Sequence, residues 1–247
     1  TGLDEHGQKV QQAAAARNVE PQLHCDEMAP RFTELWKQLH ISYDNFIRTT
    51  EERHKKVVKN ILQTVMDNGD IYQSEYEGLY SVSEERFITE KEAENGNYRD
   101  IKKLNEKNYF FKMSKYQQNL IDHINQNPDF IQPEHRKNEI LGFLDQPLND
   151  LCISRPKSRL SWGIELPFDT NYVTYVWFDA LINYISALGY GTDNSYFKKW
   201  WPASIHLIGK DILTTHTVYW PTMLMSAGIE LPKSIFAHGW WLMSESK

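Results

Sequence analysis

The first third of the chain spaces its apolar residues with the period of amphipathic helices. Residues 1–9 place two glycines around an acidic–histidine pair, which predicts a loop leading into an alanine-rich helix over Val10–Arg17. Apolar side chains three and four positions apart predict a second helix over Pro30–Ile41. A capping box followed by a longer amphipathic run predicts a third helix over Glu51–Asn68.

The pattern changes in the middle of the chain. Residues 70–111 alternate tyrosines with small polar residues and contain an Asn95-Gly96 turn signal, which predicts short strands and loops. Helices are predicted again over Lys115–Asn125 and Pro133–Asp145, the second with its proline near the first turn. The middle segment is therefore interpreted as an insertion between two parts of one domain.

Strand and helix patterns alternate from about residue 160 onward. The predicted elements are strand Tyr172–Phe178, helix Asp179–Leu188, strand Ile205–Ile208, a helix from Gly209-Lys210-Asp211 through Ala227 kinked at Pro221, and strand Ser234–Ala237. Strands separated by helices indicate a parallel sheet. The predicted fold class is thus α/β, a doubly wound parallel sheet of Rossmann type split by an insertion.

Composition narrows the class of protein. The chain is 40% hydrophobic and 13% aromatic, which excludes a disordered chain, and its apolar runs are too short for a membrane-spanning helix. A net charge of −6 argues against a nucleic-acid binder that uses its whole surface. Only Cys25 and Cys152 are present, which fits a reducing compartment. Because the chain opens on Thr1-Gly2 and stops at Ser246-Lys247, we expect an internal piece of a longer protein.

Ligands of open parallel sheets bind beyond the carboxyl ends of the strands. Four loops are candidates by this rule: Gly2–Gly7, Trp177–Tyr184, Gly209–Asp211 and His238–Trp240. In the first loop, Asp4 can bind an ammonium group or take part in acid–base chemistry, although a solvated turn explains the same residues. A metal site is disfavoured there, because no second His or Cys lies at helix spacing.

The segment Gly209-Lys210-Asp211 lies between a predicted strand and a predicted helix. Backbone N–H groups and the positive end of a helix dipole can bind an anion there, and Asp211 can accept hydrogen bonds from ribose hydroxyls. A helix cap with a turn glycine is the alternative interpretation. The spacing of a P-loop is absent.

Two sets of residues are typical either of a hydrophobic core or of an apolar binding pocket. One set recurs on one face of a predicted helix: Leu213, His216 and Trp220. The other follows the Tyr172 strand: Trp177, Ala180, Leu181 and Tyr184. A pocket built from both suits a polarisable thioether, which packs well on ring edges. With Asp4 binding an ammonium group, such a pocket would hold an amino acid.

Together these segments resemble methionyl-tRNA synthetase of bacterial or organellar type, a class I aminoacyl-tRNA synthetase. The resemblance rests on TGLDEHGQKV, GLYSVSEERFITEKE, YFFKMSKYQ, WGIELP, YVWFDALINYI and HLIGKDILTTHTVYWPTMLMSAGIELPKSIFAHGWW. Each motif alone is weak. Because they keep the family's order over essentially all 247 residues, the combined match is specific.

The resemblance implies a Rossmann-type catalytic domain in two parts, 1–66 and 153–247, separated by a connective-peptide insertion at 67–152. It implies that methionine and ATP, with Mg²⁺, form methionyl-adenylate and pyrophosphate, and that methionine then passes to tRNA(Met). It further implies a monomer or homodimer in the bacterial cytoplasm or the mitochondrial matrix.

The resemblance also assigns residues. Asp4 matches the carboxylate that binds the methionine ammonium group. The side-chain pocket would be formed by Trp177, Ala180, Leu181, Tyr184, Leu213 and His216, with Trp220 behind it. ATP would be bound by Gly209, Lys210, Asp211, His238, Gly239, Trp240 and Lys247.

The chain departs from the family's pattern in three places. The phosphate-binding His-x-Gly-His motif is absent, and the KMSKS loop would only begin at Lys247. Because both motifs supply positive charge to the phosphates, this piece alone is expected not to activate methionine. Many relatives have zinc-binding cysteines where this chain has Ser81 and Glu84, so no zinc is expected. Lys112-Met113-Ser114-Lys115 is interpreted as a coincidental match to KMSKS, because Tyr116-Gln117 follow it.

Two alternatives remain open from the sequence. A class I synthetase for isoleucine, valine or leucine needs a large editing domain, and the expected insertion is too small for one. A non-catalytic binding module could use Trp200-Trp201 and Trp240-Trp241 to stack sugars or peptides, which predicts that these tryptophans are exposed.

Overall fold

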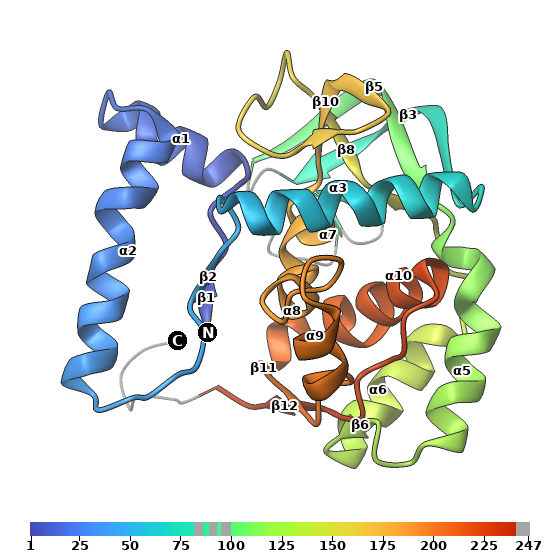
Figure 1. Ribbon diagram of the computed structural model, residues 1–247. Coiled ribbons are helices and arrows are strands. Elements are labelled where there is room, and N and C mark those ends of the chain that lie inside the picture. Colours follow the sequence, from blue (N-terminus) through green and yellow to red (C-terminus); the bar gives the residue numbers. More distant parts are fainter. Residues whose placement is uncertain (82–85, 89–92, 95–99, 241–247) are drawn as a thin grey trace.

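The computed structural model describes residues 1–81, 86–88, 93–94 and 100–240 (Figure 1). Its first part contains, in order, β1 (Gly2–Leu3), α1 (Gln8–Ala16), α2 (Pro21–Gln38), β2 (Ile47–Arg48) and α3 (Glu52–Asp67). β1 and β2 pair in parallel. In Figure 1, α1 and α2 lie at the left, and α3 crosses the centre of the molecule beside α8 and α10, which it contacts.

The structure confirms the first and third predicted helices and corrects the second. α2 begins at Pro21 rather than Pro30, because Pro21 occupies its first turn, where the missing N–H costs nothing. Pro30 lies inside the helix. The apolar residues that predicted this helix are largely exposed among the described residues, at 39% for Phe32, 44% for Leu35 and 56% for Leu39.

The middle segment forms long strands rather than the predicted short ones. β3 (Ile71–Ser81) and β5 (Ile101–Phe111) pair antiparallel in unbroken register along their whole length. β4 (Arg86–Ile88) and β7 (Leu151–Cys152) flank them, giving the order β4-β3-β5-β7. The alternating pattern predicted strands correctly, but the sequence alone did not show that β3 and β5 pair with each other. The turn expected at Asn95-Gly96 lies outside the described residues.

Both helices predicted after this sheet are present, as α5 (Gln117–Gln126) and α6 (Glu134–Leu144). Pro133 is the N-cap residue of α6. Between the helices, β6 (Ile131–Gln132) pairs in parallel with a strand from the end of the chain. The middle segment is thereby tied to the parallel sheet by main-chain hydrogen bonds.

The first strand of the last third is shorter than predicted. β10 (Asp169–Thr174) pairs antiparallel with β8 (Ser154–Pro156) and β9 (Glu165–Leu166). Val176, Trp177 and Phe178, which were expected to extend it, instead open helix α7 (Val176–Leu181). Short runs of β-branched and aromatic residues do not distinguish a strand from a buried helix, which explains the error.

The expected parallel sheet is present at the end of the chain, but without the strand that begins near Tyr172, which lies in the separate antiparallel sheet β8-β10-β9. β11 (His206–Gly209) and β12 (Ile235–His238) pair in parallel, and β6 completes the order β11-β12-β6. Two short helices, α8 (Asn183–Ser186) and α9 (Asn194–Trp200), precede β11. The long helix expected after it is a 3-10 turn (Lys210–Ile212), a π-helix (Thr215–Tyr219) and α10 (Trp220–Ala227), with Pro221 in the first turn of α10 instead of at an interior kink.

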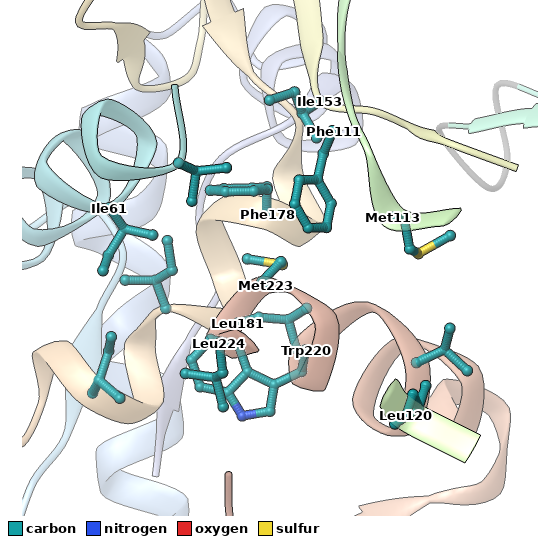
Figure 2. Packing of buried hydrophobic residues seen from close by; sticks show 14 of the residues in the cluster. Ile61, Phe111, Met113, Leu120, Ile153, Phe178, Leu181, Trp220, Met223 and Leu224 are labelled. Atoms are coloured by element: carbon teal, nitrogen blue, oxygen red, sulfur yellow. The ribbon is translucent and has the colours of Figure 1, made fainter. Parts of the chain in front are cut away.

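One hydrophobic core joins all three parts of the chain (Figure 2). Its buried members include Ile61 of α3, Phe111 of β5, Phe178 of α7 and Trp220 of α10. Phe111 and Phe178 meet edge to face with ring centroids 6.4 Å apart. The middle segment therefore packs on the same core as the elements that carry the candidate loops. No helix among the described residues is long and apolar enough to cross a membrane.

Candidate active site

The two loops that follow the parallel strands lie side by side. Gly209 and His238 end β11 and β12 as register partners. Beyond them, Trp240 Nε1 donates to Asp211 Oδ1 at 3.3 Å, and the Lys210 ammonium lies 4.1 Å from the centre of the Trp240 ring. A Cβ atom at Gly209 would lie 2.6 Å from Asp211 Oδ1, so only glycine allows this carboxylate position.

The predicted ATP-binding residues are thus brought together, as far as the structure describes them. Asp211 and Trp240 are exposed at this edge and accessible to a ligand. Lys247 lies outside the described residues.

The two predicted pocket surfaces meet at Tyr184, at the start of α8. Its hydroxyl lies 2.8 Å from His216 Nε2, and its ring centroid lies 6.0 Å from that of Trp220. Trp177 approaches the same histidine edge to face at 6.5 Å. Three further predicted residues are buried in the adjacent segments: Ala180, Leu181 and Leu213. Residues from two separate segments therefore form one aromatic cluster.

The hydrogen bonds define the protonation of the His216–Tyr184 pair. His216 Nδ1 lies 2.9 Å from the Ile212 carbonyl oxygen, which can only accept, so this nitrogen carries the hydrogen. Nε2 is then the acceptor for the Tyr184 hydroxyl. Burial lowers the pKa of His216 and raises the pKa of Tyr184 to about 12, so both groups are neutral at pH 7. The cluster thus consists of polarisable rings without net charge, which pack on the hydrophobic core.

His206 also belongs to this cluster and was missed by the sequence analysis. Its ring centroid lies 4.1 Å from that of Tyr184, with the two rings tilted by 39°, and its Nε2 accepts from Trp220 Nε1 at 3.2 Å. Burial, with a smaller effect of His216, lowers the pKa of His206 to about 3. The local sequence could not have identified it, because β11 buries His206 and exposes Leu207, the reverse of what their polarity predicts.

Because His206 is buried in its neutral form, the free energy of unfolding should fall in mild acid. Its pKa is about 3 when folded and 6.5 when unfolded, so the unfolded chain binds more protons between these values. The contribution of neutral His206 to stability is fully present above pH 6.5. Between pH 6.5 and about 3 it decreases by about 1.4 kcal/mol for each pH unit. Melting temperatures from about pH 7.5 to 5, where carboxylates stay ionised, should fall more steeply for the wild type than for His206→Phe. Parallel curves would contradict this assignment.

The loop containing Asp4 is anchored instead of being a freely solvated turn. Asp4 is exposed, whereas the next residues, Glu5 and His6, are buried. The Glu5 carboxylate accepts from Arg48 Nε at 2.8 Å and from the Thr50 hydroxyl. Gly7 follows with a φ of 103°, a backbone conformation that favours glycine and starts α1. The anchored loop presents Asp4 at the surface.

A second buried polar cluster was not found from the sequence. Asp179 Oδ2 lies 2.6 Å from His6 Nδ1, and its Oδ1 lies 2.6 Å from His54 Nε2. His54 Nδ1 in turn lies 2.8 Å from the Ser186 hydroxyl. The partners are 173 and 125 residues apart along the chain, so no local pattern could connect them.

The KMSKS-like segment at 112–115 has a structural role. Lys115 Nζ forms an ion pair with buried Asp70 at 2.6 Å, and Tyr116 and Ser226 donate to the same carboxylate. These contacts tie the middle segment to α10. No group of three possible metal ligands occurs among the described residues, and Glu84 lies outside them, so the absence of zinc stays a prediction.

Of the paired tryptophans of the binding-module alternative, the described part of the chain exposes two and buries one. Trp200 and Trp240 are 52% and 61% exposed, but Trp201 is buried and its Nε1 donates to the Glu230 carbonyl at 2.8 Å. Trp241 lies outside the described residues. The Trp200-Trp201 pair is therefore split between surface and core.

Comparison with known proteins agrees with this geometry. The family model described as tRNA synthetases class I (M) matches residues 1–97 and 95–247. Methionine--tRNA ligase of Clostridium perfringens is 53% identical over all of this chain and 39% of its own length. That of Bacillus subtilis is 47% identical over all of this chain and 40% of its own length. The chain thus spans about two fifths of these curated relatives.

Solved structures show the same similarity. Mycobacterium tuberculosis methionyl-tRNA synthetase bound by methionyl-adenylate superposes with a TM-score of 0.92 at 43% identity, over 97% of this chain and 49% of that one. The free form of that enzyme gives a TM-score of 0.80 at 41% identity, over 88% and 45% of the two chains. These matches confirm the Rossmann-type α/β class expected from the sequence. The chain belongs to the methionyl-tRNA synthetases, a class I family.

Proposed function

We propose that the protein containing this chain is a methionine–tRNA ligase, which activates methionine with ATP and transfers it to tRNA(Met). The observation that carries the proposal is the neutral aromatic cluster around Tyr184 and His216, together with the exposed Asp4 and the Gly209–Asp211 loop. The curated relatives named methionine--tRNA ligase support it. The similarity to a synthetase bound by methionyl-adenylate also supports it.

In the proposed reaction, a methionine carboxylate oxygen forms a bond to the α-phosphorus of ATP, taken as its magnesium complex. The bond from that phosphorus to the bridging oxygen breaks, and pyrophosphate leaves. The protein acts mainly by positioning the two substrates and by stabilising charge on the phosphates. The methionine ammonium donates to Asp4, Lys210 supplies positive charge, and Asp211 accepts from ribose hydroxyls beside Trp240.

The pocket chemistry accounts for the choice of methionine. A thioether packs on ring edges and polarisable faces, and the proposed wall consists of Trp177, Ala180, Leu181, Tyr184, Leu213, His216 and Trp220. The neutral His216–Tyr184 pair adds polar atoms without charge. A straight, flexible side chain fits between such rings better than a β-branched one, which is stiff at χ1.

The division of the chain is also a proposal. Residues 1–66 and 153–247 would form the two parts of the catalytic domain, and residues 67–152 the insertion. The antiparallel β4-β3-β5-β7 sheet supports a separate middle unit, and the β6–β12 pairing supports its close attachment. The bacterial relatives and the two free cysteines support a cytoplasmic location.

Methionine-dependent exchange of pyrophosphate into ATP by the full-length protein tests the proposed function. We expect exchange with methionine, because the step is reversible and needs no tRNA. Lack of exchange with methionine would overturn the proposal.

A further inference from the structure

A single buried carboxylate joins three segments that are far apart in the sequence. Asp179 on α7 contacts His6, in the loop after β1, and His54, on α3, each at 2.6 Å. His54 extends the chain of contacts to Ser186 on α8 at 2.8 Å. All four side chains are at most 5% exposed, and their polar atoms are bonded to one another.

The chemistry of the cluster defines its hydrogen bonds. Burial alone raises the pKa of Asp179, but His6 and His54 hold it below the usual value, so the carboxylate is ionised. An ionised carboxylate only accepts, hence His6 Nδ1 and His54 Nε2 both donate to it. Hydrogen bonds to a buried charge are short and about twice as strong as neutral ones. The His6 ring also packs 5.3 Å from Trp162, whose Nε1 donates to the Glu5 carbonyl at 2.6 Å.

The position of this cluster connects the two ends of the proposed methionine site. His6 lies two residues after Asp4, the proposed ammonium ligand. Asp179 lies on α7 between Trp177 and the Ala180-Leu181 pair, which belong to the proposed side-chain pocket. The His6–Asp179 bond therefore links the ammonium-binding loop directly to the pocket helix.

We propose that Asp179 is a positioning residue for methionine, which holds the Asp4 loop at a set distance from the aromatic pocket through His6. This inference rests on the proposed function. Methionine would be bound at its ammonium group and at its side chain, so the distance between these two parts of the site must stay constant. A misplacement of the substrate by about 1 Å can lower the reaction rate about 100-fold. Asp179 itself does not touch the substrate.

Asp70 offers a matched control, because it is also a buried carboxylate with several hydrogen-bond donors. It is 1% exposed and is bonded by Lys115, Tyr116 and Ser226. Burial raises its pKa and these donors lower it to below the usual value, as for Asp179. Its partners tie the middle segment to α10 and include none of the proposed methionine ligands.

The test compares Asp179→Asn with Asp70→Asn in the full-length protein. His6 and His54 donate to different oxygens of Asp179, and an asparagine has an NH₂ group in place of one of them, so one of the two acceptor positions is lost. We expect Asp179→Asn to raise the KM for methionine about tenfold or more in pyrophosphate exchange and to leave the KM for ATP within about twofold. Asp70→Asn should lower the melting temperature without this change in KM. Equal methionine KM values in both variants would overturn the inference.

Rescue at His6 provides a second test should Asp179→Asn fail to fold. His6→Phe keeps a ring against Trp162 but removes the donor, whereas His6→Asn can keep a donor close to the Nδ1 position. We expect His6→Phe to raise the KM for methionine. The KM of His6→Asn should return most of the way to the wild-type value. Equal KM values for the two would overturn the inference. Absence of methionine-dependent exchange in the wild type would instead overturn the proposed function, and the inference with it.

Discussion

Replacing Asp4 by alanine is expected to lower kcat/KM for methionine by roughly 10- to 100-fold in pyrophosphate exchange by the full-length protein. The proposed ammonium–carboxylate hydrogen bond is charged, and such bonds contribute about 1.5–3 kcal/mol, or roughly one to two powers of ten. Asp4 is exposed and its neighbours Glu5 and His6 anchor the loop, so the fold should tolerate the change. Steady-state kinetics with varied methionine measure the effect.

Asp122→Ala is the matched control for Asp4→Ala. Asp122 is also an exposed aspartate, and its Oδ1 accepts from Gln118 Nε2 within α5 at 2.8 Å. In Figure 1, α5 lies at the opposite side of the molecule from β1. We expect its kcat/KM to stay within about twofold of the wild type, since surface changes of this kind have small effects. Similar losses in both variants would contradict the role of Asp4.

Trp220→Ala is expected to have the largest combined effect on stability and on methionine binding. Trp220 is 1% exposed, its ring centroid lies 6.0 Å from that of Tyr184, and it donates to His206. Truncating a buried tryptophan costs about 3–5 kcal/mol of folding free energy. The change also opens the rear of the proposed pocket, so the methionine KM should rise by about tenfold or more. Denaturation and kinetics on the same preparation separate the two effects.

Leu120→Ala tests whether lost stability alone raises the methionine KM. Leu120 is fully buried on α5, in another part of the same hydrophobic cluster (Figure 2). Its truncation costs about 2–5 kcal/mol of folding free energy. We expect the methionine KM of this variant to stay near the wild-type value. A rise equal to that of Trp220→Ala would show that the pocket assignment is wrong.

The local sequence pattern was sufficient to predict those helices and strands that are determined by their own residues. The helix over 52–67 and the parallel strands β11 and β12 match their predictions within two residues, because periodicity is a local signal. The capping box expected at the start of this helix is wrong, since Glu51 is the N-cap residue and forms no side-chain capping hydrogen bond. The predicted pairing of parallel strands also placed Gly209–Asp211 beside His238–Trp240, whereas Trp177–Tyr184 follows β10, which is antiparallel to its neighbours.

The remaining features depend on contacts between distant segments. The pairing of β3 with β5, and the helical conformation of Trp177 and Phe178, follow from tertiary packing that no short window contains. The same holds for His206 and Asp179, whose partners lie on other elements. In α2, an apolar periodicity predicted a helix but neither its start at Pro21 nor its exposure.

Pyrophosphate exchange by the full-length protein, measured with each proteinogenic amino acid in turn, tests the central claim most directly. The account predicts exchange with methionine alone, because the Asp4 loop and the aromatic cluster around Tyr184 together suit an amino acid with a thioether side chain. Exchange driven by a different amino acid would contradict the pocket assignment, and no exchange with any amino acid would contradict the proposed activity.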